Sequence, residues 1–282
     1  MLDFDVIESQ FRAAVRVMPK LVRPSVRRVL VVTDLEPEPA AGLGAQVQGF
    51  LRVLDGAEYV TLARGDYYGI RGLLGKLEAE RPDLIVTFRS LFEAEKDLPH
   101  TLGSYVDMLT QATTTPVLLL PSPTRPNFEA ALTNTDRVMV LTDHLVGQDA
   151  LVSWGLRLVE SGGCLQLVHI EDDRVFARYL DAISKIPGLD TELAETAIEA
   201  RLLSEAKDYA EAVQDILQKE HPEVQLKTLI RRGHTVRDVR AIAEDEACDV
   251  VVMNTKDQDQ LAMAGKAYSL AVELLDKPLL LL

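Results

Sequence analysis

Short runs of aliphatic and β-branched residues recur along the chain with little alternation between apolar and polar positions. Strands of this kind are buried on both faces, as in parallel sheets covered by helices. They are predicted at 28–33, 58–63, 83–87 and 116–120 in the first half and at 137–142, 164–170, 224–231, 249–253 and 278–282 in the second. Helical periodicity lies between them, near 41–54, 69–80, 101–111, 148–160, 191–220, 235–246 and 264–275. This alternation predicts an α/β fold with doubly wound parallel sheets.

The longest helical pattern lies in the second half. Its apolar residues recur every three or four positions, while Glu and Lys fill the other side. They are Ala194, Ile198, Leu202, Ala206, Tyr209, Val213 and Ile216. One long amphipathic helix is therefore expected over 191–220.

A second amphipathic pattern precedes the first strand, in residues 1–25. Its apolar positions predict a helix over 3–22 and are Phe4, Ile7, Phe11, Val15, Met18 and Val22. We expect this N-terminal helix to dock on the first domain. Its polar side is basic, which leaves partner binding or contact with a membrane surface as the alternative.

The strand patterns of the two halves repeat in the same order. Residues 28–34 and 137–143 share five identities at an offset of 109. Two later strands of the first half, 82–86 and 115–120, also resemble strands of the second half, 248–252 and 277–282. The sequence therefore predicts two homologous domains, a shortened one at 26–121 and a complete one at 136–282. A proline-rich linker, 122–135, is expected between them.

Composition narrows the classes of function. The formal net charge is −14, and a field of that sign disfavours nucleic-acid binding. The two cysteines lack CxxC spacing, so they support neither a disulfide framework nor a cysteine-rich zinc site. No apolar run approaches the ~18 residues of a membrane span. We expect a cytoplasmic protein.

Five motifs of the second half resemble the universal stress protein family in their order and spacing. They are Val138–Asp143, Leu167–Ile170, Arg232–Val236, Asp249–Met253 and Lys277–Leu282. The first half resembles the same family in part. The resemblance implies two tandem Rossmann-like domains, of the type shared with adenine nucleotide alpha-hydrolases, and a role in stress response or regulation.

Members of this family that bind ATP use a Gly-x2-Gly-x9-Gly-(Ser/Thr) loop, because amides can approach phosphate only where side chains are absent. Aligned on Met253, these glycines fall on Asn254, Asp257 and Ala267. The carboxylate of Asp257 would repel a triphosphate. The resemblance therefore implies impaired or absent ATP binding and no cofactor. Binding of ATP or AMP, with slow hydrolysis, is the alternative.

The first half departs from the motif in another way, because it keeps Gly103 and Ser104 at the start of a helix. Arg89 could contact an anion there, although the same pair is also an ordinary helix cap. Asp34 and Asp143 occupy the position at which the family contacts adenine, and they could equally cap the loops after their strands. The other candidate nucleotide contacts that the resemblance implies are Thr142, Ile170, Met253 and Asn254.

A cluster of acidic and histidine side chains follows two strands expected to be neighbours. It comprises Asp143, His144, His169, Glu171, Asp172 and Asp173. A divalent cation would suit this chemistry. The stronger interpretation is a solvated acidic loop without a metal, since side chains alternate along a strand. No Ser–His–Asp order or nucleophile elbow occurs, so no catalytic residue is expected.

The final strand of each domain is an aliphatic run at the end of a sheet. An uncovered edge of this kind invites pairing, and members of the family associate through it. We therefore expect 116–120 to pair with 278–282 within one chain, giving a monomer, with a homodimer as the alternative. The expected function is that of a regulatory binding protein rather than a catalyst. An adaptor that recruits a partner through the N-terminal helix is a further alternative.

Overall fold

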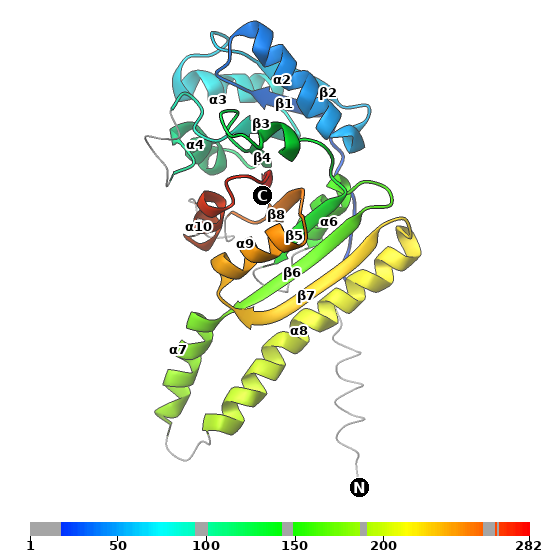
Figure 1. Cartoon of the computed structure of the whole chain (residues 1–282), viewed down its shortest axis with the longest axis vertical. Coiled ribbons are helices and arrows are strands. Elements are labelled where there is room, and N and C mark those ends of the chain that lie inside the picture. Colours follow the sequence, from blue (N-terminus) through cyan, green and yellow to red (C-terminus); the bar gives the residue numbers. More distant parts are fainter. Residues whose placement is uncertain (1–17, 94–100, 143–148, 187–190, 256–262, 264) are drawn as a thin grey trace.

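The computed structural model describes residues 18–93, 101–142, 149–186, 191–255, 263 and 265–282. Nine strands in these residues form one continuous sheet, in the order β2-β1-β3-β4-β9-β8-β5-β6-β7 (Figure 1). The strands are β1 (Arg28–Val32), β2 (Glu58–Leu62), β3 (Leu84–Phe88), β4 (Val117–Leu120), β5 (Arg137–Thr142), β6 (Cys164–Asp172), β7 (Gln225–Gly233), β8 (Val250–Met253) and β9 (Leu279–Leu281).

The two halves of the chain each contribute a parallel part of this sheet. In the second half the order β9-β8-β5-β6-β7 reverses direction at β5, as expected of a doubly wound domain. The order β2-β1-β3-β4 of the first half follows the same path without the third strand, as expected. The two parts form one continuous sheet, because β4 and β9 pair with each other.

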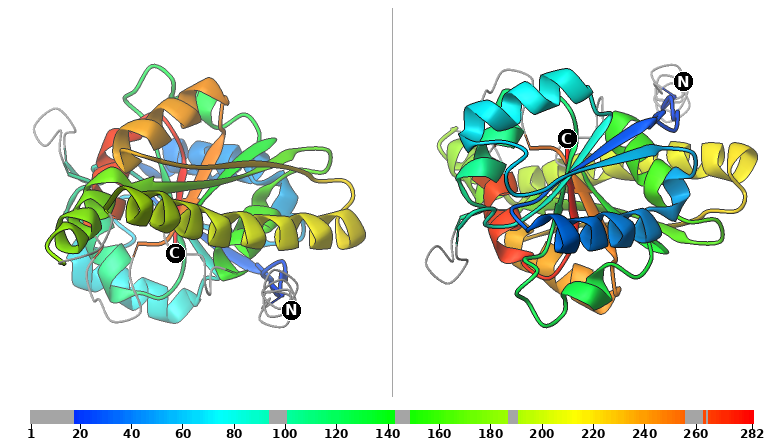
Figure 2. Two further views of the ribbon diagram at one scale, coloured as in Figure 1. Left: turned by 90° about the horizontal axis from the view of Figure 1, so that it is seen from below. Right: turned by 90° about the horizontal axis from the view of Figure 1, so that it is seen from above.

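Helices cover both faces of the sheet, as Figure 2 shows from below and above. They are α2 (Pro37–Phe50), α3 (Gly69–Glu80), α4 (Ser104–Ala112), α5 (Phe128–Ala131), α6 (Asp149–Leu158), α7 (Asp173–Ser184), α8 (Thr191–Glu220), α9 (Thr235–Asp245) and α10 (Gly265–Glu273), with a short 3-10 helix at Arg52–Leu54. All nine strand and helix predictions of the second half agree with these bounds to within about two residues. The long helix over 191–220 is confirmed.

The inner strands carry the core. Every residue of β3, β4, β8 and β9 is buried, which explains why their sequences are continuous aliphatic runs. The edge strand β7 is instead largely exposed or half-buried. It carries charged side chains such as Lys227 and Arg231, which discourage pairing with another chain at that edge.

The predicted N-terminal helix is wrong at its C-terminal end, and its first part, 3–17, lies outside the described residues. Residues 18–22 are not helical. Pro19 and Pro24 disfavour a helix there. The backbone amides of Lys20 and Val22 donate instead to Asp149 and Ser153 of α6, at 2.8 and 3.1 Å. The chain thus enters along the second half.

The segment predicted as a linker, 122–135, is not a simple spacer. It forms α5 and buries Phe128 and Leu132, which are 6% and 5% exposed. Arg125 forms an ion pair with Asp276 at 2.7 Å, so the segment also contacts the end of the second half. Its apolar residues hold it against the body, whereas its prolines had suggested an extended chain.

The helix α7 was also not predicted. Residues 171–173 were interpreted as an acidic loop, but Asp172 is the N-cap of α7 and accepts a hydrogen bond from the amide of Arg174 at 2.9 Å. Together with residues 191–205 of α8, α7 forms a hairpin that projects from the body (Figure 1); we call it the helical arm.

The two halves meet at β4 and β9, which pair antiparallel with Val117 opposite Leu281 and Leu119 opposite Leu279. The expected pairing of the final strands is therefore present. Because β4 and β9 run in opposite directions, the parallel strands of the first half point the opposite way from those of the second. The carboxyl ends of the two sets therefore lie on opposite sides of the sheet, and we call each of these two rows of strand ends an edge. A site at one edge cannot merge with a site at the other.

This geometry predicts that Leu280→Ala, in the middle of β9, destabilises both halves together. Replacing a fully buried Leu costs about 2–5 kcal/mol. Calorimetry should show one unfolding transition at a lower temperature. Two separate transitions, with that of the first half unchanged, would contradict the account.

Candidate functional site

In open α/β sheets ligands bind beyond the carboxyl ends of the strands. The candidate residues therefore fall into two groups, one at the strand ends of each half. In the second half Thr142 is 2% exposed, and its hydroxyl donates to the carbonyl of Val168 at 3.3 Å. Ile170 and Met253 are buried as well, and Asn254 is half-buried. Asp143 and Asp257 lie outside the described residues. The described candidates are thus mostly parts of the core beneath this edge.

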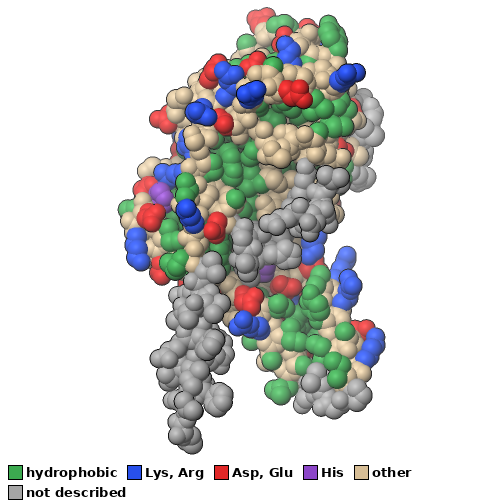
Figure 3. Space-filling view, turned by 180° about the vertical axis from the view of Figure 1, so that it is seen from behind, with side chains coloured by type: hydrophobic (Ala, Val, Ile, Leu, Met, Phe, Trp, Pro, Cys, Tyr) green, Lys and Arg blue, Asp and Glu red, His purple; other side chains and the backbone are tan. Residues whose placement is uncertain are grey.

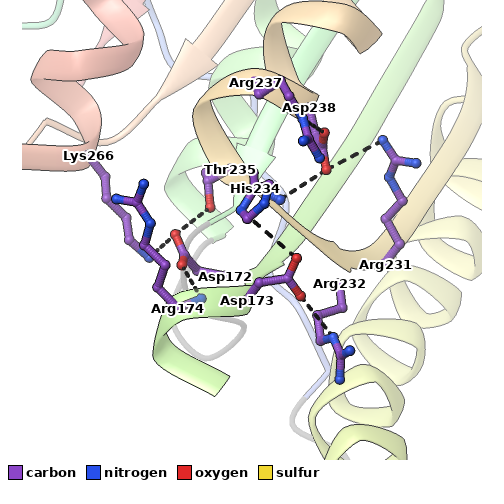
Figure 4. A network of polar contacts seen from close by, with 10 residues as sticks. All are labelled: Asp172, Asp173, Arg174, Arg231, Arg232, His234, Thr235, Arg237, Asp238 and Lys266. Atoms are coloured by element: carbon purple, nitrogen blue, oxygen red, sulfur yellow. Dashed lines mark hydrogen bonds and ion pairs between the residues drawn. The ribbon is translucent and has the colours of Figure 1, made fainter. Parts of the chain in front are cut away.

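The polar side chains at this edge form a network, which we call the strand-end network (Figure 4). Asp172, at the end of β6, accepts a hydrogen bond from Thr235 at 3.1 Å and forms an ion pair with Lys266 at 3.6 Å. Burial alone would raise the pKa of Asp172. The hydrogen bonds from Arg174 and Thr235 and the charge of Lys266 outweigh it and lower that pKa.

Arg232, at the end of β7, joins this network to the helical arm. Its guanidinium forms ion pairs with Asp173 of α7 at 2.9 Å and with Glu199 of α8 at 3.0 Å. It also lies over the ring of Phe176, 4.5 Å from the centroid, a geometry that adds a cation–π attraction. One side chain therefore fixes both helices of the arm to the sheet.

The turn from β7 into α9 is held by Asp238, whose carboxylate accepts a hydrogen bond from the amide of His234 at 3.0 Å. A Cβ on Gly233 would lie 2.1 Å from the Asp238 carboxylate, so a larger residue there would have to displace this side chain. The motif Arg232-Gly233-His234 therefore has a structural role here. Beside it lies a groove of about 670 Å³ whose charged lining comprises Arg174, Arg237 and Arg240 together with Asp172, Glu244 and Glu273.

The expected cluster of metal ligands is only partly in view, because Asp143 and His144 lie outside the described residues. Among the described residues, no group of three His, Cys, Asp or Glu side chains is arranged to hold a metal ion. His169 is buried and its Nε2 lies 3.6 Å from Glu171. The two side chains lie on one face, because residues two apart on a strand share a face.

In the first half, Arg89 is not at the start of α4. It is 1% exposed and donates hydrogen bonds to the carbonyl oxygens of Ala271 and Leu274 at the end of α10. A cation is favourable there because the last carbonyls of a helix carry partial negative charge. The Arg89 side chain is therefore directed to α10 and not to Gly103 and Ser104, and its role as the counter-charge of an anion stays a prediction.

The start of α4 is filled by a carboxylate of the same chain. Glu93 accepts hydrogen bonds from the amide of Ser104, at 3.2 Å, and from its hydroxyl. Gly103 has a φ of +94°, and a Cβ there would lie 3.0 Å from Glu93, so this close approach needs glycine. The pKa of Asp107, in the first turn of α4, is raised by burial and by the nearby charge of Glu93.

Asp34 and a cluster of aromatic rings lie at the same edge. The Asp34 carboxylate accepts a hydrogen bond from the amide of Phe92 at 2.8 Å, so it caps a loop, one of the two roles considered for it. The ring of Phe92 packs against Tyr67 and Tyr105, with centroids 5.7 and 4.9 Å apart. Burial raises the pKa of Tyr67. We call Asp34, Phe92, Glu93, Gly103 and Ser104 the first-half site.

Comparison with known proteins relates the second half to a family. Residues 134–265, just under half of the chain, match the model of the universal stress protein family. This part of the chain is therefore similar to universal stress protein domains. The match does not extend to the first half, for which a second universal stress protein domain stays a prediction. No curated protein matches the chain by sequence.

Two solved structures share the fold over 92% of this chain. A universal stress protein from Archaeoglobus fulgidus is 14% identical, with a TM-score of 0.54 and 98% of its own chain covered. A protein of unknown function from Pseudomonas aeruginosa is 13% identical, with a TM-score of 0.53 and 92% of its own chain covered. At these identities the likeness shows the fold alone.

We predict that Arg232→Met loosens the helical arm and leaves the core intact, because the substitution removes the ion pairs to both helices. Amide exchange over 173–186 and 193–205 should accelerate, while that of β5 stays unchanged. Arg201→Met is the matched control, since Arg201 forms an ion pair with exposed Glu205 of the same helix. Equal effects of the two variants would contradict this role.

The lowered pKa of Asp172 predicts a dependence on acid. Ionised Asp172 stabilises the fold fully above its unfolded pKa of about 3.9, and this contribution is lost as the pH falls through the lower folded value. Asp172→Asn should therefore lose stability at pH 7 but show a shallower decline below pH ~4 in urea titrations. Asp181→Asn, at an exposed position, serves as the control. An unchanged acid slope in Asp172→Asn would refute the prediction.

Proposed function

We propose that the protein is a cytoplasmic regulatory binding protein of the universal stress type, without catalytic activity and with impaired or absent nucleotide binding. One observation carries the proposal: the Glu93 carboxylate occupies the amide and hydroxyl of Ser104 at the start of α4. A phosphate would need these same donors. The chain thus supplies its own anion where a ligand's anion would bind.

The surroundings of the first-half site support this proposal. The cation that could have balanced a phosphate, Arg89, is buried against the end of α10. Asp34, at the position that would contact adenine, is engaged by the amide of Phe92. Binding a nucleotide here would require all three contacts to break and a phosphate to approach a carboxylate, which is unfavourable at short range.

The second half supports the proposal more weakly. Asn254 replaces the first glycine of the phosphate loop, and its side chain is half-buried beyond β8. Nucleotide binding at this edge is the second candidate. One observation favours it: Lys266, in the first turn of α10, places a cation beside Asp172 at the strand ends.

No described helix combines the length and apolarity that crossing a bilayer requires.

Titration calorimetry of the full chain with ATP and magnesium tests the proposal. We expect no binding tighter than about 1 mM, because Glu93 occupies the donors of Ser104 in the first half and Asn254 replaces the first glycine of the loop in the second. Sub-micromolar affinity would overturn the proposal, and its loss in Lys266→Ala would assign the ligand to the second half.

The role of Glu93 has its own readout. In Glu93→Ala the amide of Ser104 should shift in NMR spectra when inorganic phosphate is added, whereas it should not shift in the wild type. Glu80→Ala removes another carboxylate of the first half, one that pairs with Arg28, and should behave like the wild type. Equal shifts in all three proteins would show that Glu93 does not fill an anion site.

A further inference from the structure

The helical arm is built as an incomplete bundle. It consists of two helices that extend beyond the sheet (Figure 1), and Arg232 fixes them at the base. Only the later part of α8 packs fully on the body, where Ala206, Ala210 and Val213 are buried. Two helices that stand alone can bury only the surface between them, so an apolar stripe wider than this surface stays open.

Such an open apolar surface is present on the arm. Tyr179 and Ile186 are 51% and 53% exposed, and Ile198 and Leu202 of α8 are only half-buried. Figure 3 shows hydrophobic side chains gathered on the arm in the view from behind. Apolar groups gathered on a surface in this way mark an interaction site, and a third amphipathic helix is the occupant that a two-helix hairpin lacks.

The N-terminus of the described chain lies beside this surface. The amide of Lys20 donates to Asp149 at 2.8 Å. The same carboxylate receives the hydroxyl of Tyr209, from α8, at 3.3 Å. Met18, where the described chain begins, is 56% exposed. The preceding seventeen residues therefore start within reach of the middle of α8.

Length and spacing fit as well. From Tyr209 back to Ile198 the axis of α8 covers about 17 Å, and a helix over residues 3–17 would cover about 22 Å. The apolar residues of the N-terminal segment include Ile7, Phe11 and Val15, four residues apart. The half-buried apolar residues of α8 include Ile198 and Leu202, with the same spacing, and the stripe ends at Ala206, which is already buried against the body. Two stripes of equal period that run in the same direction can pack side by side.

We propose that residues 3–17 dock as an amphipathic helix on the apolar surface of the helical arm and complete a three-helix bundle with α7 and α8. The first domain, where sequence alone placed this segment, is then not its docking site. The proposal is independent of nucleotide binding. Arg12 and Arg16 of the segment would lie near the acidic side chains of α8, which include Glu199, Glu205 and Asp208.

Disulfide trapping tests this contact. Cys164 and Cys248, the free cysteines of the described chain, are first replaced by alanine. Phe11→Cys is then combined with Leu202→Cys in the full-length protein, under mild oxidation. We expect a bond within one chain, seen as loss of both free thiols at monomer mass.

The control pair combines Phe11→Cys with Tyr68→Cys, since Tyr68 is 84% exposed in the first half. It should remain reduced. A bond between two chains in the Leu202 pair would instead show that a second copy covers the arm. No bond, or equal trapping by both pairs, would also overturn the proposal.

A second measurement does not depend on added cysteines. Phe11→Asp places a charge in the middle of the N-terminal stripe, and amide exchange over 173–186 and 193–205 should then accelerate about tenfold or more, since a tenfold change corresponds to the loss of about 1.4 kcal/mol of docking energy. Glu8→Gln is the control with an uncharged polar change. Unchanged exchange in Phe11→Asp would contradict docking on the arm.

Discussion

The antiparallel pairing of β4 with β9 is the constraint on which the rest of the structure depends. Each strand ends the sheet of its own half and is fully buried, so neither could stay unpaired without exposing an aliphatic edge to water or to other chains. Their pairing makes one nine-stranded sheet. It also directs the carboxyl ends of the two halves to opposite edges. The two candidate sites therefore have separate surroundings within one molecule.

Arg89 depends on the same junction. It follows β3, and it reaches the end of α10 only because β9 brings that helix beside the first half. A buried guanidinium is costly unless its donors are paired, and the last carbonyls of α10 accept hydrogen bonds from its two terminal nitrogens. The hydrogen bonds that direct Arg89 away from the first-half site thus also connect the two halves beside the β4–β9 pair.

Much of the fold could be predicted from the sequence, because buried parallel strands leave continuous aliphatic runs such as Val117–Leu120. The family of the second half followed from five motifs in order. The helix α7 was missed although Asp172 is a good N-cap and Val175, Tyr179 and Ile183 have helical spacing. The acidic run before it was given more weight than this periodicity. Pro19 and Pro24 were equally visible and should have ended the N-terminal helix.

The sites were harder to predict, because their chemistry depends on contacts between distant residues. Nothing in the local sequence shows that Glu93 turns back to Ser104, or that Arg232 joins two helices to the sheet. The candidates Arg89 and Asp34 were residues of the right type at the right strand ends. Each forms hydrogen bonds with another part of the chain, and only the three-dimensional structure shows these contacts.

The central claim is that the β4–β9 junction makes the two halves one cooperative unit. Native-state hydrogen exchange in low denaturant tests it most directly, through the amides of β1, β4, β5 and β9. The account predicts that the slowest amides of both halves share one opening free energy and one denaturant dependence. Two distinct sets, with the first half opening independently of the second, would contradict it.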